Sequence, residues 1–326
     1  MRRRDFLGLL PTLTWACAVG SSDATLRAPA DAALPDSSDG ERVLATARSD
    51  YNHVIVTQQG ALRRMYFEVA DGRRLLQSTH DLNRPNSLDH EVFQTMVAGL
   101  LVQPEVGRAC MIGVGGAQLS NFLFARLPGL EIDVVDICPA VVELAREYFG
   151  VPDDPRYRMH VGDGRVFVEQ APPRSYDLLI HDAYRGHSIP RHLRTVEFFA
   201  ACAERITING VVVANMHRRT PRYPIDRETM ASVFRHSYRF WSADDVQTTI
   251  VASNAEAELD PAQLLDNAHR LQPLVDFDLL GLARRCTTER DWGEAEPLHD
   301  DFAAEQLEGA AEQHNRSCTP TCEDDP

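Results

Sequence analysis

The sequence predicts an α/β protein in which a Rossmann-like, doubly wound sheet follows a small antiparallel β unit. Two observations support the large sheet. Short apolar runs alternate with helical patterns from about residue 89 onward, and a glycine turn after the first of these runs is followed by a run that ends in an acid. The third observation is a cluster of short strand patterns with turn residues upstream, which predicts the antiparallel unit.

Residues 1–20 resemble a twin-arginine export signal. Arg3-Arg4 precedes Phe6-Leu7, a modestly apolar run reaches about Gly20, and Ala16-Cys17-Ala18 offers a cleavage site. We therefore expect export to the periplasm. The alternative is a cytoplasmic protein whose N-terminal residues are not an export signal. Residues 21–40, rich in Ala, Asp, Ser and Pro, are expected to form a linker.

Residues 41–88 are predicted to form the small β unit. Strand patterns occupy residues 51–57, 64–69 and 74–77, with Gln59-Gly60 and Asp71-Gly72 as turns.

Residues 89–255 are predicted to form the Rossmann-like domain. Its expected helices cover residues 89–101, 119–127, 139–148, 165–170, 195–206 and 226–236. Its expected strands cover residues 109–112, 132–136, 157–161, 176–182, 210–215, 238–241 and 248–252.

Residues 256–326 are predicted to contain acidic helical segments followed by a disordered tail. Much of the formal charge of −15 lies in this part, and that charge argues against a nucleic acid as partner. Cys110, Cys138 and Cys202 fall in expected core elements, and Cys318 and Cys322 could pair if the chain is exported. The spacing of the tail cysteines, with no histidines nearby at ligand spacing, argues against a zinc site.

The glycine turn Gly113-Val114-Gly115-Gly116 predicts a nucleoside site. Glycines let the backbone approach a ligand, and Asp136, at the end of the next strand, is placed to accept from both ribose hydroxyls. Gln118 stands where a dinucleotide fingerprint has its last glycine, and no phosphate-binding G-x-x-x-x-G-K-[ST] motif occurs.

Two further strand ends carry acids. Asp163-Gly164 follows the third strand and is placed to accept from an adenine amine, while Asp182 ends the fourth strand. Because ligands bind outside the carboxyl ends of parallel strands, these groups are expected to share one crevice. Simpler roles remain open: Gly162-Asp163-Gly164 as a turn, and Asp182 as a cap. This set fits S-adenosylmethionine or a relative of it.

From Tyr51 to His217 the sequence resembles the spermidine synthase (polyamine aminopropyltransferase) family, as a divergent member. The resemblance implies a methyltransferase-type fold and a nucleoside site with contributions from the β unit. The positions that match family site residues are Asn52, Gln77, His90, Glu91, Asp136, Asp163, Gly164, Asp182 and Pro190.

The resemblance implies transfer of an aminopropyl group from decarboxylated S-adenosylmethionine to a polyamine such as putrescine, without a metal. It also allows a homodimer. Asp182 is implied as proton acceptor, and His90 with Glu91 as amine contacts. Tyr184 could orient the nucleophile or act as a lid contact. His181, His187 and His192 are expected to be structural or exposed.

Three positions depart from the family pattern. Gly116 stands where the family has the acid that holds the donor's ammonium. Arg185 replaces the second acid of the D-x-x-D loop, and Asp89 replaces the tyrosine before the histidine that matches His90. A hydrogen bond to a charged group contributes about 1.5–3 kcal/mol, so Asp89, Glu91 or Glu197 would have to substitute. The alternatives are a methyltransferase that uses intact S-adenosylmethionine, and a non-catalytic protein that binds a nucleoside or polyamine.

Overall fold

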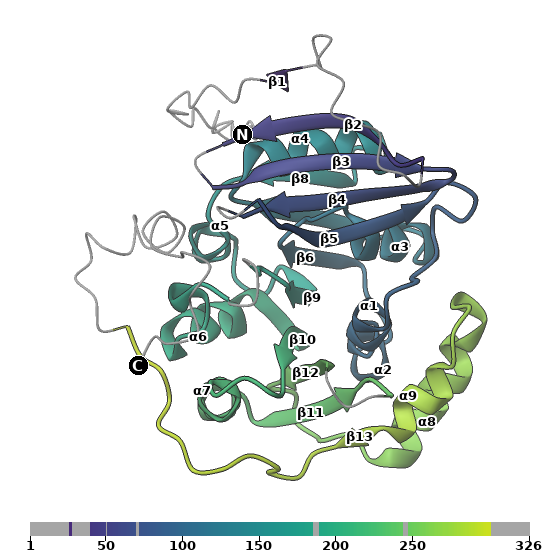
Figure 1. Ribbon diagram of the computed structural model, residues 1–326. Coiled ribbons are helices and arrows are strands. Elements are labelled where there is room, and N and C mark those ends of the chain that lie inside the picture. Colours follow the sequence, from purple (N-terminus) through teal and green to yellow (C-terminus); the bar gives the residue numbers. More distant parts are fainter. Residues whose placement is uncertain are drawn as a thin grey trace, which may run out of the picture.

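The computed structural model describes residues 26–27, 40–49, 51–69, 72–184, 189–243 and 247–300. These residues form two sheets (Figure 1). A five-stranded antiparallel sheet lies over one end of an eight-stranded, mostly parallel sheet that has helices on both faces. The predicted fold class is therefore confirmed. No helix of the described residues is long and apolar enough to cross a membrane.

The small sheet has the strand order β1-β2-β3-β4-β5, and each neighbouring pair is antiparallel. Its strands are β1 (Leu26–Arg27), β2 (Arg42–Arg48), β3 (His53–Gln59), β4 (Leu62–Glu68) and β5 (Arg74–Asp81). The expected strands begin only at residue 51, so β1, within the residues expected as a linker, and β2 are additions. The sequence of β2, RVLATAR, contains two alanines and few strong strand formers, and pairing with β3 compensates for that weak preference.

The large sheet has the order β13-β11-β12-β10-β9-β6-β7-β8. The five neighbouring strands β10, β9, β6, β7 and β8 are parallel, and β12 is antiparallel to β10. The strands are β6 (Arg108–Ile112), β7 (Glu131–Asp136), β8 (Tyr157–Val161), β9 (Tyr176–His181), β10 (Ile206–His217), β11 (His236–Trp241), β12 (Gln247–Ser253) and β13 (Cys286–Thr287).

The helices cover both faces of this sheet (Figure 1). They are α1 (Glu91–Met96), α2 (Gly99–Val102), α3 (Gln118–Arg126), α4 (Pro139–Tyr148), α5 (Gly164–Gln170), α6 (Val196–Arg205), α7 (Tyr223–Val233), α8 (Pro261–Leu271) and α9 (Leu279–Arg284), with 3₁₀ turns at Arg191–Leu193 and Gln272–Leu274. The single helix expected over 89–101 is two short helices, because the Ala98 N–H bonds the Thr95 carbonyl three residues back at 3.0 Å.

The buried apolar residues form two cores. One core joins α3, α4 and α8 to the small sheet, and the other lies beneath α6 and α7. Cys110, Cys138 and Cys202 are buried in these cores, as expected. From β6 the chain forms β7 and β8 on one side of that strand and then crosses to form β9 on its other side. The carboxyl ends of β6 and β9 therefore flank the topological switch point of the sheet.

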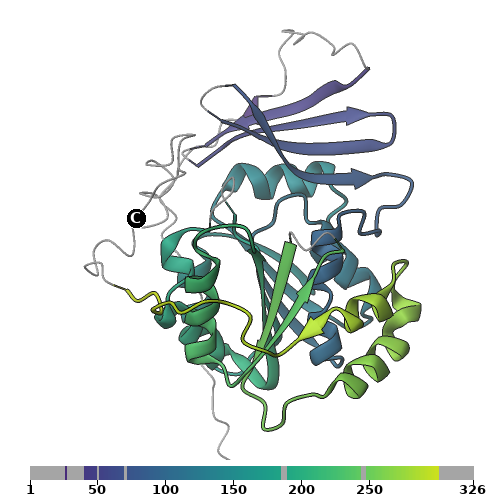
Figure 2. The same cartoon turned by 60° about the horizontal axis from the view of Figure 1, so that its bottom comes forward.

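After β13 the described chain runs as an extended strap, residues 288–300, along α7 and α6 (Figure 2). The Leu298 carbonyl accepts from the Val196 N–H at 2.8 Å, and Asp300 makes a bidentate ion pair with Arg165 at 2.6 and 2.9 Å. Helices α8 and α9 agree with the expected helical segments, whereas the strap is extended. The predicted disordered tail and Cys318 and Cys322 lie outside the described residues.

Candidate active site

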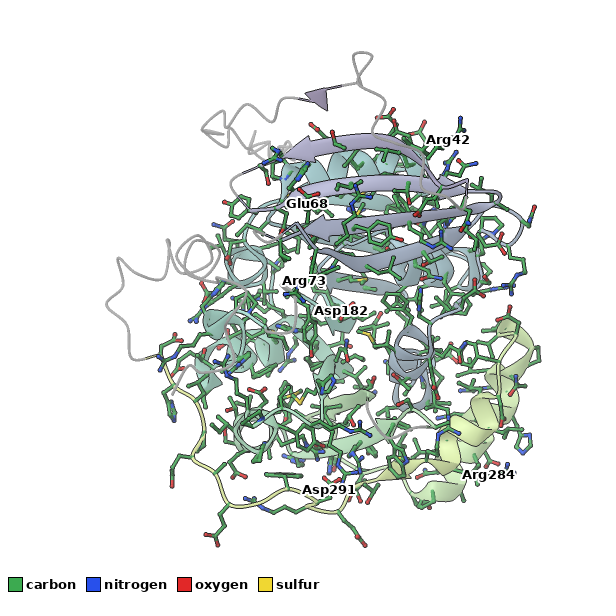
Figure 3. All side chains as sticks on the ribbon, in the orientation of Figure 1. Arg42, Glu68, Arg73, Asp182, Arg284 and Asp291 are labelled. Carbon is green, nitrogen blue, oxygen red and sulfur yellow. The ribbon has the colours of Figure 1, made fainter. Side chains whose placement is uncertain are left out.

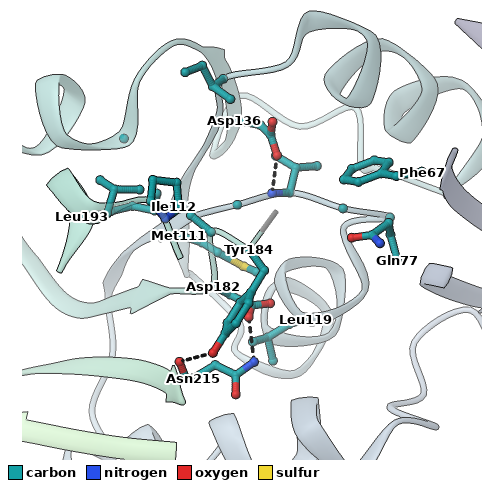
Figure 4. Close-up of a pocket in the computed structure, with 18 of the residues that line it drawn as sticks. Phe67, Gln77, Met111, Ile112, Leu119, Asp136, Asp182, Tyr184, Leu193 and Asn215 are labelled. Atoms are coloured by element: carbon teal, nitrogen blue, oxygen red, sulfur yellow. Dashed lines mark hydrogen bonds between the residues drawn. The ribbon is translucent and has the colours of Figure 1, made fainter. Parts of the chain in front are cut away.

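A cavity of about 740 Å³ lies at the carboxyl ends of β6 to β10, beneath the small sheet. Figure 4 shows part of its lining, with Asp136 and Asp182 on different sides. Of the predicted site residues, those that line the cavity are Asn52, Gln77, Gly113, Gly115, Gly116, Asp136, Asp163, Gly164, Asp182, Tyr184 and Pro190. Residues from Asn52 to Pro190, far apart in the sequence, therefore meet at one place.

The glycine turn after β6 has no room for side chains at two positions. Gly113 has a φ of +96°, and a Cβ there would contact the Asp182 carbonyl oxygen. A Cβ on Gly116 would lie 2.5 Å from Ser78 Oγ and 2.8 Å from Phe149 Cδ1. The packing of Ser78 and Phe149 against the turn therefore leaves no room for a carboxylate side chain at Gly116.

Asp136 fixes the turn and lines the cavity. Its carboxylate accepts from the Val114 N–H and from the Cys138 N–H, both at 2.9 Å (Figure 4). Burial raises the pKa of Asp136, and these two backbone bonds oppose that shift. Each bonded oxygen keeps a second lone pair, which is available to ribose hydroxyls.

Asp163 is the N-cap of α5 and is held on both oxygens. Oδ1 accepts from the Arg165 and Val166 N–H groups at 2.8 and 3.1 Å, and Oδ2 lies 2.8 Å from His192 Nε2. Burial opposes ionisation of Asp163, but the bond and charge of His192 and the backbone bonds outweigh it, so its pKa is lowered. An adenine amine can use only the remaining lone pair of Oδ2.

Asp182 follows β9 and faces the middle of the cavity (Figure 4). Its Oδ1 accepts from Asn215 Nδ2 at 3.0 Å, and the Tyr184 hydroxyl donates to the Asn215 carbonyl at 3.0 Å. Burial raises the pKa of Asp182 to about 6, against the opposing Asn215 bond. A carboxylate with such a pKa is ionised at neutral pH yet accepts a proton more readily than an exposed one.

Three of the residues predicted to contact the amine, Asp89, His90 and Glu91, have contacts with other residues. Asp89 is exposed and pairs with Arg84 at 2.8 Å. Glu91 accepts from the Ala243 N–H at 2.5 Å, and His90 packs edge-on against Phe93 with ring centroids 6.2 Å apart. None of the three is among the described residues that line the cavity, although Phe93 is. Their role in amine binding stays a prediction.

Comparisons with known proteins agree with this geometry. A family model described as Spermine/spermidine synthase domain matches residues 99–232. The polyamine aminopropyltransferase of Vibrio vulnificus is 28% identical over 274 residues, which cover 81% of this chain and 91% of that protein. The crystal structure of a probable spermidine synthase from Corynebacterium glutamicum superposes with a TM-score of 0.64 at 19% identity, over 80% of this chain and 97% of that chain.

The chain is thus similar to the spermidine synthase family, over residues 99–232 for the family model and over most of its length for the Vibrio relative. Similarity extends to methyltransferases, since the eEF1A lysine and N-terminal methyltransferase of Xenopus laevis is 28% identical over 142 residues, covering 39% of this chain and 20% of that protein.

The loop after Asp182 is described only in part. Tyr184 and Pro190 line the cavity, whereas Arg185 and His187 lie outside the described residues. Among those described, no group of three or more His, Cys, Asp or Glu side chains is placed to hold a metal ion.

Sequence reasoning missed two residues of this candidate site. Asn215 is a polar residue near the end of an apolar strand, the same signal that identifies Asp182. His192 is 2% exposed, lines the cavity and bonds Asp163, yet its sequence context is an ordinary loop. Its position depends on the 3₁₀ turn at Arg191–Leu193, which no local pattern predicts. His181 is buried between Phe198 and Phe199, as a structural histidine.

Proposed function

We propose that the chain transfers an aminopropyl group from decarboxylated S-adenosylmethionine to an amine. The observation that carries this proposal is the convergence of three strand-end carboxylates, Asp136, Asp163 and Asp182, on one cavity. Two suit a nucleoside, and the third, with its pKa raised to about 6, suits a proton acceptor. The names of the relatives indicate a polyamine acceptor, and the family resemblance implies putrescine as one example.

The reaction needs an unprotonated amine. An alkylammonium has a pKa near 10.4 by analogy with lysine, so the attacking nitrogen must lose a proton near neutral pH. That nitrogen forms a bond to the carbon beside the sulfonium, the carbon–sulfur bond breaks, and its electron pair stays on sulfur as methylthioadenosine. The proton passes to Asp182, which Asn215 holds in place.

This proposal includes a changed recognition of both substrates. Gly116 offers no carboxylate to the donor's ammonium, and Arg185 replaces an acid in the loop that follows Asp182. Decarboxylated S-adenosylmethionine would then be held mainly through its nucleoside, by Asp136 and Asp163.

A methyltransferase is the second candidate, and Gly116 favours it. Without an acid at that position the site does not select a donor by its aminopropyl ammonium, so intact S-adenosylmethionine meets no obvious barrier there. The similarity to a lysine methyltransferase is in line with this alternative.

Mass spectrometry of the products tests the proposal directly. The protein is incubated with an amine mixture and with either decarboxylated or intact S-adenosylmethionine. Aminopropyl transfer releases methylthioadenosine and adds an aminopropyl group to an amine. Release of S-adenosylhomocysteine would instead identify a methyltransferase, and the absence of both products would favour a non-catalytic binding protein.

A further inference from the structure

The strap, residues 288–300, reaches the start of α5, where the predicted adenine acid lies. Asp300 makes a bidentate ion pair there: its Oδ1 and Oδ2 accept from Arg165 Nη1 and Nη2 at 2.9 and 2.6 Å. Arg165 follows Gly164 in α5, and its own backbone N–H donates to Asp163 Oδ1 at 2.8 Å. One arginine therefore contacts both the strap and an acid that lines the cavity.

The Arg165 guanidinium also holds the 3₁₀ turn that carries His192. Its Nη1, which donates to Asp300, donates as well to the His192 carbonyl at 3.2 Å and to Thr195 Oγ1 at 3.4 Å. The His192 ring lies 2.8 Å, through Nε2, from Asp163 Oδ2, and both of these residues line the cavity. A continuous path of contacts therefore leads from Asp300 through Arg165 and His192 to Asp163.

This path runs through the interior of the domain. Arg165 and His192 are buried, and the Asp300 side chain is only 14% exposed. Burial opposes the charge of Arg165, but its bonds to Asp300 and Glu169 outweigh burial and raise the pKa of the guanidinium. Of these two acids Glu169 is 44% exposed, so Asp300 is the better shielded partner. A neutral residue at position 300 would leave a buried guanidinium short of a partner, and the guanidinium would shift toward Glu169.

The backbone of the strap fixes the position of Asp300. The Asp300 N–H donates to Glu197 Oε2 at 2.8 Å, in the first turn of α6. Two residues earlier, the Leu298 carbonyl accepts from the Val196 N–H at 2.8 Å, and the Leu298 N–H donates to Thr229 Oγ1 at 2.9 Å. These bonds tie the end of the strap to α6 and α7, so the Asp300 carboxylate is presented to α5 in a defined orientation.

The orientation of Asp163 decides which base fits the predicted adenine position. Its Oδ1 accepts from two backbone N–H groups of α5, and its Oδ2 is shared with His192, which leaves one lone pair of Oδ2 for a base. Adenine presents an amine donor at position 6, whereas hypoxanthine presents a carbonyl acceptor, so this lone pair favours adenine and opposes hypoxanthine. A displacement of His192 would turn the carboxylate and weaken that distinction.

We infer that Asp300 is a positioning residue of the nucleoside site, through which the strap contributes to the selection of adenine over hypoxanthine. Asp300 is not part of the cavity lining and acts through Arg165, whose guanidinium places His192 and whose backbone holds Asp163. This inference rests on the proposed use of an adenine nucleoside. It adds to that site a determinant that lies 135 residues after Arg165 in the sequence.

The ratio of two affinities tests the inference. Methylthioadenosine and methylthioinosine, which differ in the base alone, are titrated calorimetrically into the full chain. The wild type should bind methylthioadenosine about tenfold more tightly or better, and Asp300→Asn should reduce this ratio by at least about threefold. Asn keeps the size of the side chain but has one acceptor oxygen and no charge. A general loosening of the site would weaken both nucleosides together and leave the ratio unchanged.

The strap offers a matched control in Asp291. This acid accepts from two buried arginines, Arg227 at 3.2 Å and Arg239 at 2.6 Å, and none of the three lines the cavity. Figure 3 shows Asp291 on the strap, well separated from Asp182. Asp291→Asn should therefore lower the stability of the chain without changing the ratio of affinities. An equal fall of the ratio in Asp291→Asn and Asp300→Asn would overturn the inference.

Two further variants test the route of the effect. In an Asp163→Ala background, Asp300→Asn should change the ratio no further, because the residue that distinguishes the bases is absent. A second fall of the same size would mean that Asp300 acts by another route, and it would overturn the inference. Arg165→Lys keeps the charge but loses the planar fork that contacts Asp300 and the His192 carbonyl together, so it should also lower the ratio. It keeps the test decisive if Asp300→Asn does not fold.

An unchanged ratio in Asp300→Asn would overturn the inference, as would equal affinities of the two nucleosides for the wild-type chain. The ratio of affinities does not depend on turnover. A failure of the proposed reaction therefore appears as missing release of methylthioadenosine from decarboxylated S-adenosylmethionine by the wild-type chain. A failure of this inference appears instead as an unchanged ratio in variants that still bind methylthioadenosine.

Discussion

Asn215 Nδ2 donates to Asp182 Oδ1 at 3.0 Å across the carboxyl ends of two neighbouring parallel strands, β10 and β9. Burial favours the neutral form of Asp182, whereas this bond favours the charged form. The result is a pKa of about 6, which leaves a carboxylate at neutral pH in a buried position. The pair therefore has the properties required of a general base and the residue that orients it.

Replacing Asn215 should change the pH dependence of turnover. In Asn215→Ala the bond to Asp182 is lost, while the backbone carbonyl that accepts from Tyr184 remains. The acid limb of the kcat/KM profile should move up from about pH 6 by about one unit or more, because the ionised form loses a stabilising bond. Asn209→Ala, at an exposed position on the same strand, is the control. An unmoved limb would contradict the assignment.

Asp136→Ala should abolish methylthioadenosine binding. The carboxylate holds the turn through Val114 and Cys138 and is the predicted ribose ligand, so affinity should fall by about 100-fold or more. Asp163→Ala should weaken binding less, and it should reduce the discrimination between adenine and hypoxanthine nucleosides. Titration calorimetry measures both, with Asp153→Ala, an exposed acid before β8, as control. Wild-type affinity in Asp136→Ala would mean that the nucleoside site is elsewhere.

The strap should contribute to stability through Asp300. In Asp300→Ala the Arg165 guanidinium, whose side chain is only 8% exposed, loses a bidentate partner and keeps Glu169. Removing one partner of a buried pair costs about 3 kcal/mol, so the urea midpoint should fall clearly. Glu204→Ala removes a partner of Arg205 that is 70% exposed, and it should change the midpoint little. Equal effects of the two variants would show that the strap does not stabilise the domain.

Export is expected from Arg3-Arg4 and the Ala16-Cys17-Ala18 site, which lie outside the described residues. Intact-mass analysis of the protein purified from its own cells should show loss of about eighteen residues. Replacing Arg3-Arg4 by two lysines should prevent that loss. Recovery of the wild-type chain beginning at Met1 would contradict this prediction.

Much of the fold and of the crevice at the strand ends could be predicted because their signals are local. Each parallel strand is a short apolar run, and Asp136, Asp163 and Asp182 follow such runs directly. Since the carboxyl ends of parallel strands share one edge, three local patterns suffice to predict one crevice. The small sheet also follows from its turns, apart from β2, whose weak pattern depends on pairing with β3.

The partners of these acids could not be predicted, because they depend on register and on loop geometry. Asn215 meets Asp182 because Ala214 is paired with His181 across β10 and β9. His192 reaches Asp163 only through the 3₁₀ turn before α6. Asp89 and Glu91, whose role at the amine stays a prediction, contact Arg84 and the Ala243 N–H, and neither partner is evident from the residues beside them in sequence.

The substitution Asp182→Asn should raise the free energy of unfolding at neutral pH, because it removes a buried charge. Because the pKa of Asp182 is raised on folding, ionisation destabilises the folded state as pH rises from about 4 through about 6. Above that window the variant should be more stable than the wild type by roughly 1–3 kcal/mol, and at pH 4 the two should be alike. Denaturant unfolding at both pH values checks this expectation.

The most direct measurement is the rate of methylthioadenosine release by Asp182→Asn from decarboxylated S-adenosylmethionine, with the acceptor in saturating amount. The substitution keeps the shape and one acceptor oxygen but cannot take a proton. Release should fall by about 100-fold or more while methylthioadenosine affinity barely changes, and it should recover partly at high pH, where free amine is available. A wild-type rate in Asp182→Asn would contradict the assignment of Asp182 as the base.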